Sequence, residues 1–596
     1  MKIVQLKIKN FRGIKCSNLL FPDHVVLIGD NNTGKSTVFE ALDLALGPDR
    51  LSRRSVIDEH DFYNGQYLSK DKETPSPKVE IEATIVNLSD EQQRHFKDYL
   101  EWWCKNSNAL HTSRKPETVD KKSIEAALRV SFIGEYDPDE DDFVGSTCFT
   151  RSITEATKPQ AFTKKDKQKC CFLYLRSLRT GSRALSLEKG SLLDIILRIK
   201  EIRPQMWENT IDELSKFNIV EDPSIGISGV LASIEKSMKK YVPREWGINP
   251  HLKVSSLTRD DLRKVITAFI ATGEGDHAAP FYRQGTGTIN ILVLAMLSQI
   301  AEDKQNVIFA MEEPETAIPP YTQKRIVHEI KNLSSQSFFT SHSPYVLEEF
   351  ELKEIVILHR TPDGGLIQNS VELPESIKHK KYRQDFRQRF CEGLLSRRIL
   401  VAEGATETSA IPVAARRLSE LRPDLYTSLE ALGICVINAE SDSKIADLAS
   451  LYTKLNKRVF ALCDKQAPPN EQKIEQNVEK LFMHDEKGFE DLVLKNTSQE
   501  AIDRFVDSIE WPLHLRKKFP HPKENAKNAL KECFSWSKGN WGVADFLAQC
   551  VENDFPQWIR NTCLELKTLC IPVTPQETND DSTGSDNTGD NINPLS

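Results

Sequence analysis

A glycine-rich run near the N-terminus has the residue types needed to hold a nucleoside triphosphate. The residues from Gly29 to Thr37, GDNNTGKST, contain the pattern G-x-x-x-x-G-K-[ST]. Glycines allow backbone N–H groups to curl around phosphate oxygens, and a helix that starts behind the loop adds partial positive charge. We expect Lys35 to reach the β- and γ-phosphates of ATP and Ser36 to ligate Mg²⁺. The residues expected to complete this cradle are Gly29, Asn31, Asn32, Thr33, Gly34 and Thr37.

Two adjacent carboxylates, Glu312 and Glu313, follow the apolar run Val307–Met311. Acids at the end of a strand are often only solvated, but together with a phosphate loop they fit a role in hydrolysis. We expect Glu312 to orient the Mg²⁺ ion and Glu313 to polarise the water that attacks the γ-phosphate.

A second pair of acids indicates a different metal site. Glu403 follows the apolar run Ile399–Ala402, and Asp464 follows the run Arg458–Cys463. Because ligands of α/β sheets bind at the carboxyl ends of the strands, we expect these two carboxylates to converge. Carboxylate oxygens form the hard cage that Mg²⁺ or Mn²⁺ prefers. The simpler alternative is that each acid only solubilises the end of its strand.

Hydrophobic periodicity predicts the elements that must position these residues. An apolar strand at 24–28 precedes the phosphate loop, and the helix expected at 35–46 is stopped by Gly47 and Pro48. Strand–helix alternation predicts a parallel, buried sheet, and so an α/β fold class. Its further strands are expected at 307–311, 337–340 and 354–359. A second alternation is expected at 399–402, 434–438, 458–463 and 481–484.

The composition is that of a globular protein without membrane segments. The 596 residues carry a net charge of −8, with 39% hydrophobic and 28% charged residues. No apolar run reaches the roughly 18 residues that span a bilayer, and the N-terminus lacks the features of a signal peptide. The twelve cysteines have no CxxC spacing, which fits a reducing cytosol and argues against a disulfide framework. We therefore expect a cytoplasmic protein that is not a globally basic nucleic-acid binder.

Four segments together resemble the ATPases of the RecF, Rad50 and SMC group. They are the opening LKIKNFRGI, the phosphate loop, VIFAMEEPE and FFTSHSPYVL. The resemblance implies that His342 contacts the γ-phosphate. It also implies that Gly285 and Gly287, in the segment RQGTGT, belong to the signature loop that closes the ATP site of a second subunit, although the usual Leu-Ser lead-in is missing. A homodimer that sandwiches two ATP molecules is then required for hydrolysis.

The segments that end at Glu403 and Asp464 resemble the Toprim domain of topoisomerases, primases and some nucleases. An ABC-type ATPase followed by a Toprim domain is similar to the OLD (overcoming lysogenisation defect) family of nucleases, which includes the nuclease subunit of the Gabija antiphage system. This resemblance implies that Glu407 joins Glu403 and Asp464 as a metal ligand. It further implies a ligand at Glu490, after the third Toprim strand, and a lysine used in cleavage at Lys538.

The third Toprim strand departs from the usual pattern. Toprim domains usually carry Asp-x-Asp at this point, whereas this chain has Asp464-Lys465-Gln466. Gln466 can still offer a carbonyl oxygen, which attracts a divalent ion less strongly than a carboxylate. Either another acid completes the cage or Lys538 carries more of the transition-state charge. The acids that could complete it are Glu440, Asp442 and Asp491.

Two basic stretches are candidates for contact with DNA phosphates. Lysines and arginines cluster between 378 and 398, where they form either a solvated helix face or a track for the phosphate backbone toward the metal site. The lysines at 164, 165, 167 and 169 are a weaker candidate, and we interpret them as part of a mobile loop.

We predict an ATP-regulated, metal-dependent DNA endonuclease of the OLD type, acting in antiphage defence as a homodimer or higher oligomer. Two alternatives are a non-cleaving SMC- or RecF-like DNA-binding ATPase and a sensor subunit that uses ATP as a conformational clamp. The partner is left open between a helicase, a reverse transcriptase with its DNA product, and none. The predicted domains are an ABC/RecF-type ATPase at 1–180 and 271–390, an inserted helical dimerisation region at 181–270, a Toprim domain at 391–575 and a disordered tail at 576–596.

Overall fold

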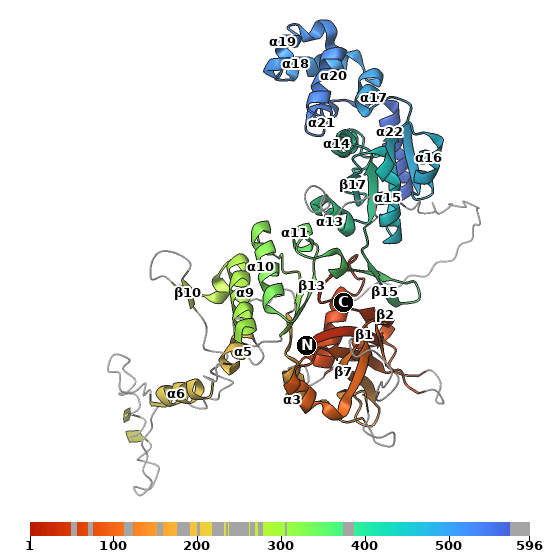
Figure 1. Cartoon of the computed structure of the whole chain (residues 1–596). Coiled ribbons are helices and arrows are strands. Elements are labelled where there is room, and N and C mark those ends of the chain that lie inside the picture. The colour runs from red at the N-terminus through yellow and green to blue at the C-terminus, as the bar shows by residue number, and fades with distance from the viewer. Residues whose placement is uncertain are drawn as a thin grey trace, which may run out of the picture. The chain divides into compact units, whose positions relative to one another are not determined.

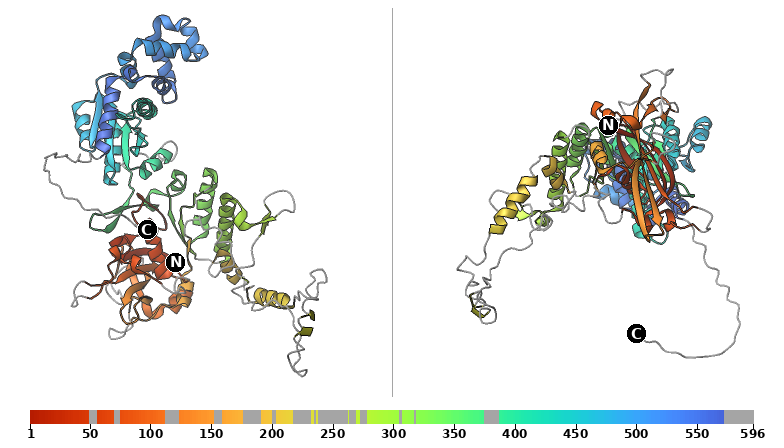
Figure 2. Two further views of the ribbon diagram at one scale, coloured as in Figure 1. Left: turned by 180° about the vertical axis from the view of Figure 1, so that it is seen from behind. Right: turned by 90° about the horizontal axis from the view of Figure 1, so that it is seen from below.

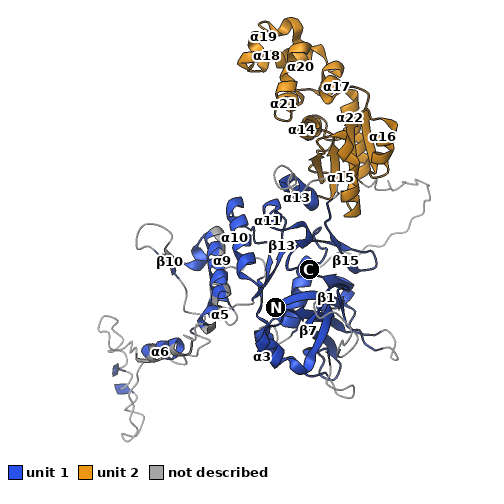
Figure 3. Ribbon diagram, in the orientation of Figure 1, with its two compact units in different colours: residues 1–395 blue, residues 396–596 orange. Residues whose placement is uncertain are grey.

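Residue contacts divide the chain, in the computed structural model, into two compact units (Figures 1 and 3). The N-terminal unit comprises residues 1–395 and the C-terminal unit residues 396–596. The structure describes residues 1–48, 56–69, 75–111, 123–151, 159–175, 191–199, 203–216, 232–233, 236–237, 262, 269–271, 278–303, 307–316, 318–373 and 387–571. The predicted tail at 576–596 and most of the predicted insertion at 181–270 lie outside the described residues.

A 13-stranded mixed sheet forms the framework of the N-terminal unit. Five neighbouring strands make up its parallel part, in the order β14 (Ile355–Arg360), β3 (His24–Ile28), β13 (Gln336–Thr340), β12 (Ile308–Glu312) and β9 (Phe172–Leu175). The register aligns their carboxyl ends, because Glu312 pairs with Thr340 and Thr340 pairs with Leu27. The four strands predicted in this region are confirmed to within one residue at each end.

The remaining strands of this sheet are mostly antiparallel. β15 (Gly365–Ser370) joins the two parts, since it pairs antiparallel with β14 and parallel with β2. The sheet then continues in the order β2, β1, β4, β7, β5 and β6, and β8 pairs with β7. The bounds of these strands are β1 (Lys2–Phe11), β2 (Ile14–Leu20), β4 (Val79–Val86), β5 (Leu100–Cys104), β6 (Ala109–Leu110), β7 (Ile124–Asp137) and β8 (Asp142–Phe149).

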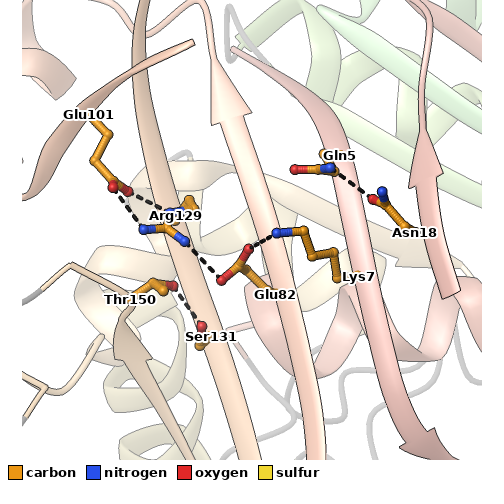
Figure 4. Close-up of polar contacts among 8 residues, drawn as sticks. All are labelled: Gln5, Lys7, Asn18, Glu82, Glu101, Arg129, Ser131 and Thr150. Carbon is orange, nitrogen blue, oxygen red and sulfur yellow. Dashed lines mark hydrogen bonds and ion pairs between the residues drawn. The ribbon is translucent and has the colours of Figure 1, made fainter. Parts of the chain in front are cut away.

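The antiparallel strands alternate between a buried face and a polar face. On the buried face, side chains such as Ile3 and Leu6 join one core with the apolar side chains of the helix that follows β3. On the polar face, Glu82 accepts hydrogen bonds from Lys7 at 3.0 Å and from Arg129 at 3.2 Å (Figure 4). Arg129 also donates to Glu101 at 2.6 Å. Cross-strand pairs of this kind contribute roughly 0.2–1 kcal/mol each, so the polar face holds the strands in register.

The helix α1 (Lys35–Leu46) follows β3 as predicted, and a buried lysine covers its carboxyl end. Lys167 is fully buried, and its Nζ donates a hydrogen bond to the Leu44 carbonyl at 2.6 Å. A cation is favourable there because the last carbonyls of a helix carry partial negative charge. Lys167 lies on the helix α3 (Lys164–Cys170), so the interpretation of these lysines as a mobile loop is wrong.

The other described elements of the N-terminal unit are mainly helices. They are α2 (Asp90–His95), α5 (Leu192–Ile199), α6 (Arg203–Lys216), α9 (Thr286–Asp303), α10 (Pro320–Leu333), α11 (Pro344–Leu347) and α13 (Arg387–Leu395), with a short strand pair β10 (Phe269–Ala271) and β11 (Ala278–Pro280). No helix of either unit, within the described ranges, is both long and apolar enough to cross a bilayer.

The C-terminal unit contains a four-stranded parallel sheet, which confirms the second predicted alternation. Its order is β17 (Ile434–Asn438), β16 (Arg398–Ala402), β18 (Arg458–Asp464) and β19 (Lys480–His484). The helices beside this sheet are α14 (Ala405–Leu421), α15 (Asp442–Lys454), α16 (Pro468–Glu475) and α22 (Gln557–Cys570).

Five further helices gather at one end of the C-terminal unit (Figures 1 and 2). They are α17 (Phe489–Asn496), α18 (Gln499–Ser508), α19 (Leu513–Lys518), α20 (Ala526–Trp536) and α21 (Gly542–Ala548). Phe505, Phe534 and Phe546 bring three of these helices together through ring contacts, and they belong to the same apolar cluster as the sheet residue Leu400. Sheet and helices therefore share one core.

Candidate active sites

The phosphate loop connects β3 to α1 and leaves backbone N–H groups available. Gly29 has a φ of 154°, and a Cβ at this position would lie 2.7 Å from the Leu358 carbonyl oxygen. Gly34, with a φ of 113°, precedes the first residue of α1 and makes no side-chain cap. The N–H groups at the start of a helix have no partner within the helix. They and the positive end of the helix dipole are the groups that bind phosphate.

Lys35 is folded back onto the phosphate loop. Its Nζ donates hydrogen bonds to the carbonyl oxygens of Gly29 at 2.8 Å and of Asp30 at 3.0 Å. Burial lowers the pKa of Lys35, while the nearby charges of Asp30 and Glu313 act in the opposite direction. Because phosphate oxygens are stronger acceptors for an ammonium group than carbonyls are, the lysine is placed to exchange these partners for a nucleotide.

The two predicted carboxylates lie at the end of β12, and each has a distinct environment. Glu312 accepts a hydrogen bond from the Tyr174 hydroxyl at 2.8 Å, and Tyr174 comes from the neighbouring strand β9. Glu313 has a φ of 45°, and its N–H donates to the Thr340 carbonyl at 3.0 Å. A left-handed conformation is unfavourable for glutamate and persists where the surrounding structure imposes it, often at functional sites.

His342 completes this site from the strand between β3 and β12. It follows β13, and its backbone N–H donates to the Glu315 carboxylate at 2.7 Å. Burial lowers the pKa of His342, and the charge of Lys35 adds to this shift, whereas Glu313 opposes it. The structure therefore brings Lys35, His342 and Glu313 together from the ends of three adjacent strands, while their roles in ATP hydrolysis stay predictions.

The segment predicted as a signature loop is partly helical. Gly285 is exposed, and a Cβ at this position would meet nothing within 4 Å. The helix α9 begins at Thr286, so Gly287 lies in its first turn and not in a loop. The role of these glycines in a second subunit stays a prediction.

In the C-terminal unit, Glu403 and Asp464 meet at the ends of the adjacent strands β16 and β18. The Glu403 carboxylate accepts a hydrogen bond from the Asp464 backbone N–H at 3.1 Å. Burial raises the pKa of Glu403, and although the Asp464 N–H works against the shift, the charges of Asp464 and Asp442 add to it. The predicted convergence of these two carboxylates is confirmed.

Glu407 and Glu490 belong to the same electrostatic neighbourhood. Glu407 lies in the first turn of α14, and burial raises its pKa to about 7, with additional contributions from Asp464, Glu490 and Glu403. Glu490 accepts a hydrogen bond from the Thr406 hydroxyl at 2.7 Å. It lies in the first turn of α17, which follows β19, the fourth strand of the unit along the chain and not the third as predicted.

These acidic side chains suit a hard divalent cation. Four carboxylates whose charges disfavour one another's ionised state are stabilised together by a positive ion. Nevertheless, no group of three or more His, Cys, Asp or Glu side chains within the described ranges is already arranged as a metal cage. The four carboxylates are therefore neighbours without being arranged as a cage, and their role as metal ligands stays a prediction.

Lys538 lies in the exposed turn between α20 and α21. The next residue, Gly539, has a φ of 77°, and a Cβ at this position would lie 2.6 Å from the Ala405 Cβ. Ala405 follows the Glu403-Gly404 turn directly. Close backbone approach at a glycine thus fixes the Lys538 turn beside the carboxylates.

His484 is a residue of this site that the sequence analysis missed. It is the last residue of β19 and pairs in register with Asp464, the last residue of β18. Its Nε2 lies 3.0 Å from the Asp464 Oδ1, and the ring is buried against Trp558 at a centroid distance of 5.1 Å. Its position in the sequence could have identified it. His484 is the last residue of the predicted strand 481–484, just as Asp464 follows the predicted strand 458–463, and the ends of parallel strands meet at one edge of a sheet.

Comparisons with known proteins bear on both units. The family model of the AAA ATPase domain matches residues 1–176 and 68–347, which together span more than half of the chain. The model of the Toprim domain of overcoming-lysogenization-defect-like proteins matches residues 394–465, which contain Glu403, Glu407 and Asp464. The chain belongs to the OLD family. The predicted architecture, an ATPase domain followed by a Toprim domain, is confirmed.

The similarity to individual OLD-family proteins is extensive but low in identity. The Old nuclease of Escherichia phage P2 is 19% identical over 496 residues, which cover 78% of this chain and 77% of that protein. The endonuclease GajA of Bacillus cereus strain VD045 is 21% identical over 429 residues, which cover 68% of this chain and 66% of GajA. A solved structure of the C-terminal region of the Burkholderia pseudomallei OLD protein is 16% identical, with a TM-score of 0.24, and covers 30% of this chain and 99% of that structure.

Gln466 of this OLD-family chain turns its amide nitrogen, and not its carbonyl oxygen, toward Glu403. Its Nε2 donates to Glu403 at 3.3 Å, and its Oε1 accepts a hydrogen bond from Asn470 at 2.8 Å. Among the acids considered as replacements, Glu440 is paired with Lys444 at 3.0 Å. Asp491 is likewise paired with Lys531. Asp442 is the one whose charge acts on Glu403.

The basic stretch before β16 gives no support to a phosphate track in its described part. Arg387 donates to the Phe350 carbonyl at 3.0 Å, and Arg389 pairs with Glu392 at 2.8 Å. Arg398 donates to the Leu432 and Cys570 carbonyls. These arginines therefore serve the fold of the OLD-family chain. The basic residues Lys378, Lys380, Lys381 and Arg383 lie outside the described ranges.

Proposed function

We propose that this protein is an ATP-regulated, divalent-metal-dependent DNA endonuclease that acts in antiphage defence. The observation that carries the proposal is the gathering of Glu403, Glu407, Asp464 and Glu490 beside the Lys538 turn. The names of the Old nuclease and GajA, which match most of this chain, support the same reaction class.

In the proposed reaction, Glu403 and Asp464 hold a Mg²⁺ or Mn²⁺ ion together with Glu407 and Glu490. Such an ion supplies the charge that polarises a phosphodiester and favours ionisation of water. Lys538 is exposed and placed beside these carboxylates, where its ammonium group can stabilise the negative charge that develops on the phosphate. His484 lies beside the buried Oδ1 of Asp464.

In the N-terminal unit, Lys35 and Ser36 bind the phosphates and Mg²⁺ of ATP, and Glu312 orients that ion. Glu313 then positions the attacking water while His342 contacts the γ-phosphate. ATP turnover regulates cleavage through a homodimer, in which Gly285 and Gly287 close the site of the other subunit. The partner protein, if there is one, is a helicase or a reverse transcriptase.

The proposal is tested by incubating the protein with plasmid DNA and Mg²⁺ or Mn²⁺, with and without ATP. We expect nicking or cutting that Glu403→Ala and Lys538→Ala each abolish, while ATP hydrolysis is unchanged because the two sites lie in separate units. Lys473→Ala, on the exposed face of α16, is the matched control and should cut normally. Cleavage by the Lys538→Ala protein at the wild-type rate would remove this lysine from the mechanism.

A second candidate function is a non-cleaving DNA-binding ATPase, and the amide of Gln466 against Glu403 favours it. Gln466→Asp separates the two candidates. If the native centre is a weakened nuclease, the added carboxylate should strengthen metal binding and raise cleavage. If neither wild type nor this variant cuts DNA under any metal or nucleotide condition, the binding ATPase replaces the nuclease.

A further inference from the structure

Three aromatic rings are in contact beside the Lys538 turn, of which His514 and Trp536 are exposed and Trp541 is half-buried. The His514 and Trp536 rings have centroids 5.1 Å apart, and the Trp536 and Trp541 rings have centroids 6.2 Å apart. Trp536 is 52% exposed, and the neighbouring Leu513 is 79% exposed. A tryptophan buries a large apolar area when it is covered, so such exposure indicates a surface that a ligand covers. His514, Trp536 and Trp541 are called the aromatic ledge below.

The ledge and the candidate nuclease centre are parts of one local structure. Trp536 ends α20, Trp541 precedes α21, and Lys538 lies in the turn between them. Gly539 in the same turn packs against Ala405, directly after the Glu403-Gly404 turn. A ligand that lies on the ledge therefore reaches Lys538 without leaving this turn.

The charge around the ledge fits a polyanion. Residues 513–541 contain seven lysines and arginines and two glutamates, a net charge of +5, in a chain whose net charge is −8. The charge falls to +3 when the two aspartates that pair with these lysines from outside the segment are included. Three of these cations, Lys518, Lys523 and Lys531, are paired with Glu532, Asp507 and Asp491. Arg516, Lys517, Lys527 and Lys538 are exposed and belong to no ion pair that the described part of the chain forms.

Exposed rings interleaved with unpaired cations are the combination that binds unpaired nucleic-acid strands. Every base has a π-face that stacks on an aromatic side chain, while the cations follow the phosphate backbone. In a duplex these faces are already covered by neighbouring base pairs, so they are available only where the strand is unpaired. A protein partner would use the apolar rings but would not require the net positive charge.

We propose that the aromatic ledge binds an unpaired DNA strand by base stacking and presents its backbone to Lys538. The inference rests on the proposed nuclease function and specifies its substrate as single-stranded or locally unpaired DNA. Trp536 supplies the stacking surface, and Arg516 and Lys517 hold the phosphates that lead to it.

The test measures DNA binding in EDTA, where no cleavage occurs. Fluorescence anisotropy compares a labelled 20-nucleotide strand with the blunt duplex of the same sequence. We expect the wild-type protein to prefer the single strand. Trp536→Ala should weaken single-strand binding about tenfold, the size expected for one lost stack, and should leave duplex binding unchanged. Trp536→Phe should restore part of the loss, because phenylalanine also stacks.

Further variants separate the contribution of base stacking at the ledge from those of charge and of other exposed aromatic residues. Tyr321→Ala removes another exposed aromatic residue, 78% exposed in the N-terminal unit, and should change neither measurement. Arg516→Ala and Lys517→Ala should weaken binding to every sequence and reduce the slope of log affinity against log salt by about 0.7 for each lost phosphate contact.

The results distinguish this inference from the proposed function. Strand binding without cleavage under any metal condition would support the ledge as a DNA-binding surface and contradict the proposed nuclease activity. Cleavage combined with equal single-strand affinity in the wild type and the Trp536→Ala protein would support the nuclease activity and contradict strand binding by the ledge. A Trp536→Ala protein that changes in sedimentation mass but not in strand affinity would show that the ledge joins copies of the chain, which would overturn the inference.

Discussion

The buried carboxyl group of Glu407 shows how strongly the C-terminal site shifts the pKa of a single residue. Its pKa is raised to about 7, first by burial and then by the charges of three neighbouring carboxylates. In the unfolded chain the group titrates at its ordinary value of 4.5. Between these two values the folded protein keeps a proton that the unfolded chain has lost, so stability falls as the pH rises.

This linkage gives a pH-dependent prediction for the metal-free protein. Glu407→Gln removes the ionisable group and should stabilise the fold in EDTA. The gain should be small near pH 4.5, grow up to pH 7 and stay constant above it, at no more than roughly 3 kcal/mol. Denaturant unfolding of the C-terminal unit at pH 4.5, 6 and 8 measures it. Glu420→Gln, on the exposed side of the same helix, is the control, and equal profiles for the two variants would contradict the prediction.

His484 gives a second prediction at the residue scale. Its Nε2 lies 3.0 Å from the Asp464 Oδ1 but at an angle that does not form a hydrogen bond, and we expect a small rotation of the ring to complete that bond when a metal ion is bound. We expect His484→Ala to weaken Mn²⁺ binding by about tenfold or more, the usual effect of removing a group that orients a metal ligand. His484→Gln should retain most of the affinity, because its amide Nε2 can occupy the place of the imidazole nitrogen.

Isothermal titration of Mn²⁺ into each variant checks this prediction, and circular dichroism shows whether the variants are folded. Similar affinities for His484→Ala and the wild type, with both proteins folded, would assign His484 a packing role only.

At the scale of elements, the parallel strands decide which groups meet. β3, β13 and β12 are neighbours in the sheet although β3 is about 280 residues before β12 in the chain, and their aligned ends bring Lys35, His342 and Glu313 together. The same arrangement at β16 and β18 brings Glu403 to Asp464. Both sites therefore follow from strand order and register, in accord with the general position of ligands in α/β sheets.

The ATP site gives a prediction at this scale. Lys35→Ala removes the ammonium group that now bonds to the loop carbonyls, and should abolish tight ATP binding. Glu313→Gln should bind ATP normally but hydrolyse it at least a hundredfold more slowly, since an amide is a poor base for the attacking water. A fluorescent ATP analogue measures binding, and phosphate release measures turnover. Wild-type turnover by the Glu313→Gln protein would assign water activation to another carboxylate.

At the scale of the whole molecule, the proposed ATP cycle needs two chains. Gly287 lies in the first turn of α9, where it follows the exposed Gly285. If this turn approaches the γ-phosphate of the other subunit, Gly287→Arg should block hydrolysis while ATP still binds to the phosphate loop. Light scattering should show at least a dimer. A mass of one chain at micromolar concentration, together with full ATPase activity, would remove the requirement for a second subunit.

Features that depend only on neighbouring residues could be predicted from the amino-acid sequence. The phosphate loop is a run of nine residues, the helix at 35–46 ends at its own glycine, and the strands β12, β16 and β18 each end at or next to an acid. Buried parallel strands are continuous apolar runs, so most of them and nearly all of their bounds were readable from the pattern. The short edge strand β9 (Phe172–Leu175) was not predicted. The two-domain OLD architecture followed from the order of these motifs.

Contacts between side chains far apart in the chain could not be predicted in this way and are known from the folded structure. Lys167 reaches the end of α1, Gly539 packs on Ala405, His484 faces Asp464, and the amide of Gln466 turns its nitrogen toward Glu403. Each of these contacts joins residues from different elements, and its geometry depends on register and packing to within about an ångström. Residue types constrain which hydrogen bonds a side chain can form, but the partner is chosen by which atoms the folded core places within reach.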